Sequence, residues 1–223
     1  MTSPLRLSDV TRLHQGQTIL TTGAPLKQAR AAMIMLHGRG ATADSILSLA
    51  NEFDAGDFAY LAPQAFNHTW YPYRFLEPIE RNEPWLSSAL QVIDDLSARV
   101  VAAGIPTGRL VLLGFSQGAC LVLEYAARHA QRYGGIIGLS GGLIGPEGTP
   151  RHYAGSFSGT PIFLGCSDID FHIPLERVRE SARVMRQLGG DVTERIYPGM
   201  DHTVNQDEID FVNGLMQEAV RAN

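Results

Sequence analysis

One stretch, residues 109–118, constrains the fold more than any other part of this chain. It reads Arg-Leu-Val-Leu-Leu-Gly-Phe-Ser-Gln-Gly, and its apolar run at 110–113 is typical of a strand buried on both faces of a parallel sheet. The residues after it, 119–127, have the pattern of a well-packed helix. A strand, a tight turn and a helix are the setting in which a strained turn presents a serine hydroxyl above the sheet. Ser116 is therefore the candidate nucleophile.

A second serine, Ser140, stands in a similar motif. With 23 glycines in 223 residues, a Gly-x-Ser-x-Gly arises by chance with a probability on the order of 0.1, so the motif alone is weak. Ser140 also follows an apolar run, but residues 142–146, Gly-Leu-Ile-Gly-Pro, cannot begin a regular helix. The context therefore selects Ser116 and makes Ser140 a loop serine at a strand end.

Predicted strands and helices alternate along the chain, with no internal repeat and no break in composition. The strands are expected at 18–22 (an edge strand), 31–36, 58–61, 110–113, around Ile136, at 161–165 and at 192–197. The helices are expected at 42–53, 85–103, 119–127, 175–188 and 204–220. This alternation predicts one α/β domain over residues 1–223, with three layers, a mainly parallel sheet and no separate cap domain.

Composition and charge exclude several classes of protein. A net charge of −5 argues against a surface for nucleic acid or anionic membrane. Two cysteines, Cys120 and Cys166, cannot build a disulfide framework and are expected to be small buried residues. Residues 1–30 contain neither a signal-peptide pattern nor a spanning helix, so we expect a cytoplasmic protein. No cysteine or histidine pair has metal-ligand spacing, and no cofactor is expected.

A serine nucleophile needs a base and an orienting carboxylate, and ligands of such sheets bind at the carboxyl ends of the strands. His202 follows the predicted strand at 192–197 and precedes the last helix, which makes it the best-placed of the seven histidines. Asp168 and Asp170 both follow the strand at 161–165, and neither periodicity nor composition separates them. The order serine, aspartate, histidine agrees with that of α/β-hydrolases.

The longest irregular segment, residues 63–84, is rich in aromatic side chains. Long loops in compact domains often bind or cover ligands. We expect this loop to wall the substrate pocket and to restrict it to small acyl groups; the alternative is a surface loop pinned by its own rings. The candidate substrate-binding residues are Phe66, Trp70, Tyr71 and Tyr73.

Five motifs, spread in order from about residue 31 to the C-terminus, carry a family resemblance. They are Leu-His-Gly-Arg-Gly at 36–40, Gly-Ile-Pro at 104–106, Gly-Phe-Ser-Gln-Gly at 114–118, Asp-Ile-Asp at 168–170 with Ile-Pro at 173–174, and Tyr-Pro-Gly-Met-Asp-His at 197–202. With them the chain resembles the small α/β-hydrolases of the phospholipase/carboxylesterase family, which includes acyl-protein thioesterases. The resemblance implies the α/β-hydrolase fold.

The resemblance also implies roles for single residues. The family's triad acid stands four residues before the proline of a D-x-x-V-P pattern, which places it on Asp170 with Ile173 in the valine position. An oxyanion hole is implied from the backbone N–H groups of Arg39 and Gln117, in agreement with the expected course of the two turns. The Arg39 side chain could bind an acidic substrate group, but a structural or solvated role is favoured.

Three functions fit these residues. The first is a serine carboxylesterase acting on small carboxylic esters, with Ser116, His202 and Asp170 as its triad. The second keeps the mechanism but acts on acyl-protein thioesters or lysophospholipids. The third is a non-catalytic binding protein. Retention of all triad residue types disfavours the third, and Arg39 and the 70–73 loop, which depart from the thioesterase pattern, favour the first. The expected partner is a small ester, and the chain is expected to be a monomer or a homodimer.

Overall fold

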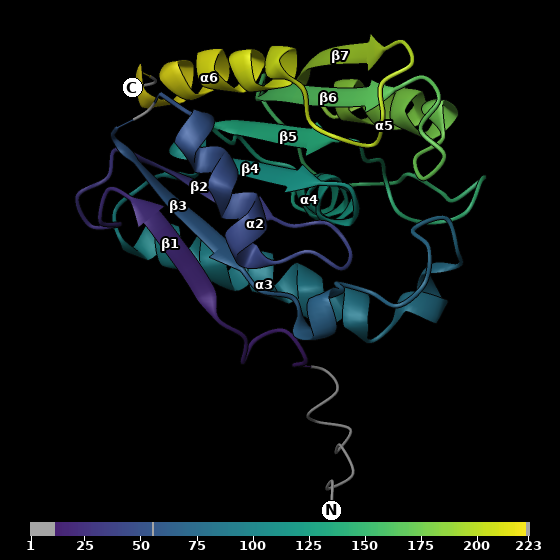
Figure 1. Ribbon diagram of the computed structural model, residues 1–223, viewed down its shortest axis with the longest axis horizontal. Coiled ribbons are helices and arrows are strands. Elements are labelled where there is room, and N and C mark those ends of the chain that lie inside the picture. Colours follow the sequence, from purple (N-terminus) through teal and green to yellow (C-terminus); the bar gives the residue numbers. More distant parts are fainter. Residues whose placement is uncertain (1–11, 55, 222–223) are drawn as a thin grey trace, which may run out of the picture.

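The computed structural model describes residues 12–54 and 56–221. Within them, seven strands form one sheet in the order β1-β3-β2-β4-β5-β6-β7. Strand β1 runs antiparallel to β3, and the other neighbours are parallel (Figure 1). The strands are β1 (Ile19–Gly23), β2 (Ala31–Leu36), β3 (Phe58–Pro63), β4 (Leu110–Phe115), β5 (Gly135–Leu139), β6 (Pro161–Ser167) and β7 (Asp191–Tyr197).

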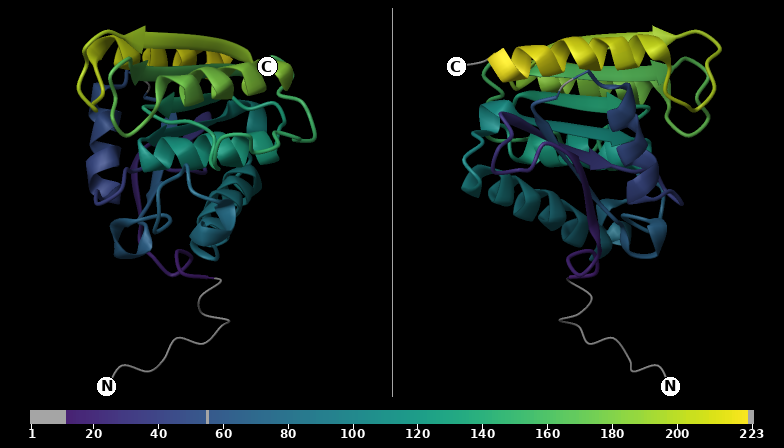
Figure 2. Two further views of the ribbon diagram at one scale, coloured as in Figure 1. Left: turned by 90° about the vertical axis from the view of Figure 1, so that its right-hand side faces the viewer. Right: turned by 60° about the vertical axis from the view of Figure 1, so that its left-hand side comes forward.

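Helices cover both faces of this sheet, which confirms the predicted three-layer α/β architecture (Figure 2). One face carries α3 (Trp85–Ala102), α4 (Gln117–Arg128) and α5 (Leu175–Gln187). The other face carries α2 (Ala43–Leu47) and α6 (Gln206–Arg221). In the part of the chain described, no helix is long and apolar enough to span a membrane.

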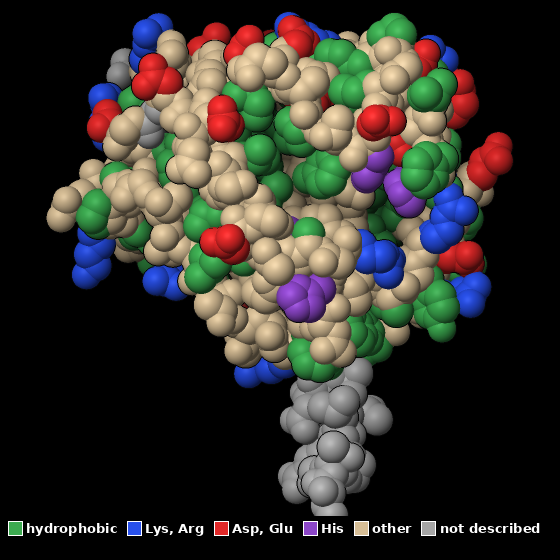
Figure 3. Space-filling view, in the orientation of Figure 1, with side chains coloured by type: hydrophobic (Ala, Val, Ile, Leu, Met, Phe, Trp, Pro, Cys, Tyr) green, Lys and Arg blue, Asp and Glu red, His purple; other side chains and the backbone are tan. Residues whose placement is uncertain are grey.

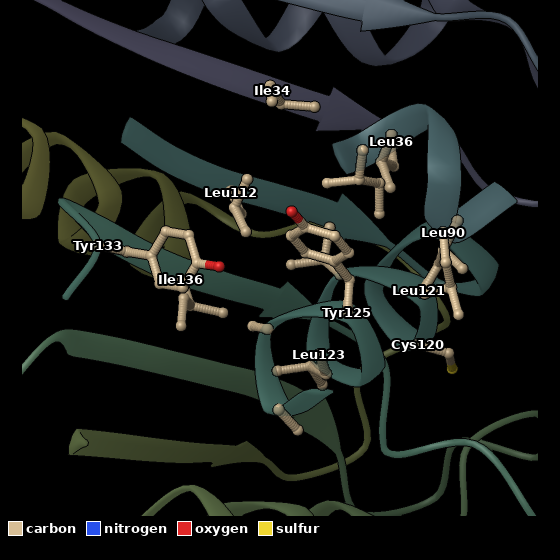
Figure 4. Packing of buried hydrophobic residues seen from close by; sticks show 14 of the residues in the cluster. Ile34, Leu36, Leu90, Leu112, Cys120, Leu121, Leu123, Tyr125, Tyr133 and Ile136 are labelled. Carbon is tan, nitrogen blue, oxygen red and sulfur yellow. The ribbon is translucent and has the colours of Figure 1, made fainter. Parts of the chain in front are cut away.

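The core divides into two clusters, one on each face of the sheet. Alternate residues of β2 belong to different clusters: Ala32 and Ile34 face α3 and α4, whereas Met33 and Met35 face α2 and α6. All six residues of β2 are buried, which is why this strand reads as a continuous apolar run. Figure 4 shows the larger cluster where Tyr125 of α4 packs against the strands.

Several boundaries differ from the expected ones. The helix expected at 42–53 ends as an α-helix at Leu47 and continues as a 3₁₀ helix, Ser48–Glu52. The Ser48 hydroxyl donates to Ser45 O (2.8 Å), a local bond that competes with helix propagation. Thr42 does cap this helix, accepting from Ser45 N at 3.1 Å. The irregular 63–84 segment contains two short 3₁₀ helices, Phe66–His68 and Ile79–Asn82.

A buried carboxyl group, Glu208, lies at the start of α6. Its Oε2 accepts from Asn205 N at 3.0 Å, while Asn205 Oδ1 accepts from Glu208 N at 3.0 Å, so the two residues cap the helix reciprocally. Its Oε1 is buried, has no partner among the described residues, and lies where a side chain on Gly165 would stand. Burial raises the pKa of Glu208 to about 7. The fold therefore holds this group best in its neutral form.

We expect Glu208→Gln to stabilise the protein more at pH 8 than at pH 5. The folded pKa lies above the unfolded value of about 4.3, so the folded state binds more protons between these values. Wild-type stability therefore falls as the pH rises towards 7, whereas glutamine does not titrate. The gain of the variant should grow by up to roughly 3 kcal/mol between pH 5 and pH 8, measured by urea unfolding. Glu218→Gln, at an exposed position of α6, is the matched control and should show no such growth.

Candidate active site

Ser116 sits on a sharp turn between β4 and α4, with φ +55° and ψ −117°. This backbone conformation is rare for a residue with a side chain. A Cβ on Gly118 would lie 2.7 Å from His37 O, and a Cβ on Gly114 would lie 2.5 Å from Ala119 N. Both glycines are therefore required by the close approach of the backbone.

The structure brings the three predicted triad residues together from the ends of three strands. The Ser116 hydroxyl donates to His202 Nε2 at 2.8 Å. His202 Nδ1 lies 2.6 Å from Asp170 Oδ2, and because the carboxylate only accepts, the proton belongs on Nδ1. The arrangement can pass the serine proton to the imidazole while the carboxylate orients the ring.

Asp170 is held in its ionised form. Its side chain is fully buried, and burial opposes ionisation. Hydrogen bonds outweigh this effect: His202 donates to Oδ2, and the backbone N–H groups of His172 (2.8 Å) and Ile173 (3.1 Å) donate to Oδ1. The pKa of Asp170 therefore lies below its usual value, and the group is a carboxylate at neutral pH.

The competing aspartate, Asp168, has a different position. It is exposed, and its Oδ1 accepts from Gly199 N at 2.8 Å. Its own N–H donates to Tyr197 O at 3.3 Å. Asp168 thus holds the turn that leads to His202 and does not contact the imidazole by hydrogen bonding. Of the two candidate aspartates, Asp170 is the one hydrogen-bonded to His202 in the described residues.

Ser140 follows β5, and no helix begins after it. It is fully buried with φ +52°, and its N–H donates to Gly165 O at 2.7 Å. Its hydroxyl has no hydrogen-bond partner within the described residues. Ser140 is therefore a buried serine at a strand end, without the base that Ser116 has.

Two backbone N–H groups, those of Arg39 and Gln117, are the candidate oxyanion donors. In the described chain neither of these amides donates to a protein acceptor, and both residues line the cavity at Ser116. The turn carrying Arg39 is fixed by His37, whose Nδ1 donates to Gly38 O (2.8 Å) and whose Nε2 accepts from Ala65 N (3.0 Å). Burial lowers the pKa of His37, so the imidazole stays neutral and can do both.

Residues 69–75 form an irregular strap beside this site, and the Gln117 side chain anchors it. Gln117 Oε1 accepts from Trp70 N at 2.9 Å, and its Nε2 donates to Tyr71 O at 2.8 Å. The sequence does not reveal this role, because Gln117 occupies a variable position of the Gly-x-Ser-x-Gly motif. The only signal was a polar side chain at the start of an otherwise apolar helix.

The far end of the strap is held by Arg39 and Asn82. The guanidinium of Arg39 donates to Pro72 O (2.8 Å) and Tyr73 O (2.6 Å), which is the structural role favoured from the sequence. The buried Asn82 accepts from Tyr73 N at 2.9 Å and donates to Arg74 O at 3.2 Å. The strap is thus bound through main-chain atoms along its length.

Of the four aromatic residues expected to contact substrate, only Tyr71 lines the cavity at Ser116. Trp70 is fully buried, and its Nε1 donates to His37 O at 2.9 Å. Phe66 packs against Trp85, and Tyr73 is 46% exposed with Arg81 over its ring. Three of the four rings therefore do not form the cavity wall expected from the sequence. They pack against other residues or face solvent away from the cavity.

The cavity at Ser116 has a volume of about 310 Å³. Its apolar wall includes Tyr71, Phe75, Cys120 and Ile173. Arg39, Arg74 and His172 also line it. Burial raises the pKa of the Cys120 thiol to about 12, so Cys120 is a neutral wall residue and not a second nucleophile. Figure 3 shows histidine side chains and blue basic side chains facing the same hollow on the right of the molecule.

A second cavity, of about 410 Å³, also reaches His202 and is lined by Ser45 and Ile46 of α2. Its apolar lining consists of Ala41, Ile46, Leu49, Phe115 and Val204. The two cavities share Gly38, Ala41, Phe115 and His202. No group of three or more His, Cys, Asp or Glu side chains suited to a metal ion occurs within residues 12–54 and 56–221.

Comparison with known proteins gives a consistent result. A sequence model described as Phospholipase/Carboxylesterase matches residues 18–219. Acyl-protein thioesterase 1 of Saccharomyces cerevisiae is 25% identical over 90% of this chain and 98% of its own length. Acyl-protein thioesterase 1 of Gibberella zeae is 31% identical over 56% of this chain and 54% of its own. The crystal structure of a phospholipase/carboxylesterase from Dyadobacter fermentans DSM 18053 is 44% identical, with a TM-score of 0.87 over 91% of this chain and 97% of that one.

We expect Gly118→Ala to destabilise the protein by roughly 3 kcal/mol or more, since its Cβ would collide with the backbone of β2 and force α4 away. Urea unfolding measures the loss. The matched control is Gly214→Ala, at an exposed position of α6 where a Cβ meets nothing within 4 Å. That change should stabilise the helix by about 0.5–1 kcal/mol. Wild-type stability in Gly118→Ala would contradict the close approach.

Proposed function

This chain belongs to the phospholipase/carboxylesterase family of α/β-hydrolases, and on that premise we propose that it hydrolyses small carboxylic esters through an acyl-enzyme on Ser116. One observation carries the proposal: the Ser116–His202–Asp170 relay opens onto a cavity of only about 310 Å³. This volume lies at the lower end of the range for small-molecule sites, and with the adjoining second cavity of about 410 Å³ the site stays within that range.

In the acylation step, Ser116 Oγ attacks the ester carbonyl carbon while its proton moves to His202 Nε2, 2.8 Å away. The imidazolium so formed is stabilised by the Asp170 carboxylate. The negative charge on the carbonyl oxygen is received by the N–H groups of Arg39 and Gln117. Collapse of this intermediate breaks the ester C–O bond, and His202 returns the proton to the leaving alkoxide.

Deacylation repeats these steps with water in place of the serine. His202 takes a proton from the water molecule as the oxygen attacks the acyl carbon, and Ser116 leaves with the proton returned from Nε2. Each oxyanion donor contributes about 10²–10³-fold to such steps in hydrolases. The positive φ of Ser116 and the pairing of His202 with Asp170 keep the groups in place for both halves of the reaction.

The same relay would serve acyl-protein thioesters or lysophospholipids, which is the alternative function. The names of the curated relatives, acyl-protein thioesterase 1, favour that alternative. The size of the cavity favours small esters, because Tyr71 and Phe75 occupy space that a long acyl chain needs. Acyl-chain preference therefore separates the two functions.

Ser116→Ala and Asp170→Asn should both lose ester turnover, by roughly 10³–10⁴-fold or more in kcat, because one removes the nucleophile and the other the orienting charge. Fluorophosphonate labelling should also disappear in Ser116→Ala, as measured by mass spectrometry of the intact protein. The matched controls are Ser140→Ala, which should keep labelling and turnover, and Asp168→Asn, which should lose much less than Asp170→Asn. If Asp168→Asn lost ester turnover while Asp170→Asn kept nearly normal turnover, Asp168 would be the orienting carboxylate instead of Asp170. A protein that no fluorophosphonate labels would be a binding protein.

With p-nitrophenyl esters of increasing acyl length, kcat/KM should peak at short chains. Each methylene that fits the cavity contributes roughly 0.8 kcal/mol, and one that collides contributes nothing. Tyr71→Ala should move the peak to longer chains, since its ring lines the cavity while its backbone stays bound to Gln117. Tyr73→Ala is the control and should leave the profile unchanged, because that ring faces solvent. A wild-type optimum at long acyl chains would favour the thioesterase or lysophospholipase alternative.

A further inference from the structure

The cavity at Ser116 has an unusual charge for a protein with a net charge of −5. Its lining includes two arginines, Arg39 and Arg74, and two histidines, but no aspartate or glutamate. Asp170 is screened from the cavity because its side chain is fully buried and paired with His202. The site therefore presents cationic groups to whatever enters it.

Neither arginine is neutralised by the protein. In the described residues, no carboxylate forms an ion pair with Arg39 or Arg74, whereas eight other arginines do so. Two of the five N–H donors of Arg39 form hydrogen bonds with the carbonyls of Pro72 and Tyr73. The side chain of Arg74 makes no hydrogen bond to a described residue, although its backbone is fixed by Asn82. Guanidinium donors thus remain available on a fixed backbone.

The second cavity differs from the first in that no arginine, lysine, aspartate or glutamate lines it. Its lining is mainly apolar, from Ile46, Leu49, Phe115 and Val204, and it adjoins the first cavity at His202. An ester carbonyl carbon attacked by Ser116 carries two substituents, and both cavities reach the imidazole of His202. The site suits a substrate that is apolar on one side of the ester bond and charged on the other.

Resting on the proposed esterase function, we propose that the preferred substrates are esters bearing a free carboxylate, which Arg74 binds together with the remaining donors of Arg39. A planar guanidinium matches a carboxylate with two parallel hydrogen bonds, which a neutral amide of the same shape cannot form. The carboxylate stands on one side of the ester bond, and a small apolar group enters the second cavity.

The test compares carboxylate esters with their neutral isosteres. Monomethyl succinate, glutarate and adipate place the carboxylate on the acyl side, and 4-acetoxybutanoate places it on the alcohol side. The corresponding primary amides are the neutral partners. For the wild type, kcat/KM should be about tenfold higher for at least one carboxylate ester than for its amide. The ester that shows this preference identifies whether the carboxylate is bound on the acyl side or on the alcohol side of the ester bond.

Arg74→Gln should abolish most of that preference, lowering the ratio of kcat/KM between the carboxylate ester and its amide by about tenfold. Arg99→Gln, an exposed arginine of α3 that does not line the cavity, is the matched control and should keep the wild-type ratio. The wild-type ratio should also fall as NaCl is raised from about 0.05 M to 0.5 M, because the interaction is screened.

Binding to Ser116→Ala supplies a second measurement that needs no turnover. Calorimetry with the same four esters should show at least one of them binding about tenfold more tightly than its amide, with the difference lost in Ser116→Ala/Arg74→Gln. If neutral esters turn over and Ser116 is labelled, but no carboxylate ester is preferred or bound more tightly, this proposal fails alone. If no ester turns over and no serine is labelled, the proposed esterase function fails, and the calorimetric comparison still decides whether Arg74 binds carboxylates.

Discussion

The close approach of Gly118 to the end of β2 is the constraint on which the rest of this site depends. Because no side chain intervenes, the first turn of α4 lies against the carbonyls of Leu36 and His37. The turn at Ser116 and the turn carrying Arg39 are thereby packed into one unit, and a Cβ on Gly38 would lie only 3.4 Å from Ser116 Cβ. Both candidate oxyanion donors are positioned before any substrate arrives, so no reorganisation is needed when charge develops.

Around this unit, two neutral histidines form hydrogen bonds with the buried backbone of the irregular segment at residues 65–70. His37 accepts from Ala65 N, and His14 accepts from Phe66 N (3.1 Å) while its Nε2 donates to Trp70 O (3.1 Å). Burial lowers the pKa of both rings, that of His14 to about 4, so each keeps one donor and one acceptor near neutral pH. The backbone polar groups of a loop without regular structure are satisfied without burying a charge.

The parts of this molecule that sequence predicts are those with a local signal. Apolar runs located the strands, and the helix following Ser116 distinguished it from Ser140. The position of His202 between a strand and the last helix marked it as the candidate base, and the structure places its Nε2 2.8 Å from Ser116 Oγ. Trp70 carried no such signal: its apolar ring suggested a pocket wall, but its N–H pairs with a carbonyl on β2's loop, 33 residues away. The anchoring role of Gln117 likewise depends on partners 46 and 47 residues away, which no periodicity reveals.

The manner in which the strap is bound has a consequence for how this enzyme family can diversify. Arg39 and Asn82 form hydrogen bonds with backbone carbonyl and amide groups of residues 72–74. A substitution in this segment keeps these backbone groups, except that proline at a bonded N–H position would remove the donor. The side chains at 72–74 therefore contribute little to keeping the wall in place. Selection, or a laboratory library, can exchange them and so alter what the neighbouring cavity accepts while the catalytic framework stays intact. In this segment, backbone atoms hold the structure in place, whereas side-chain atoms can change which substrates the cavity accepts.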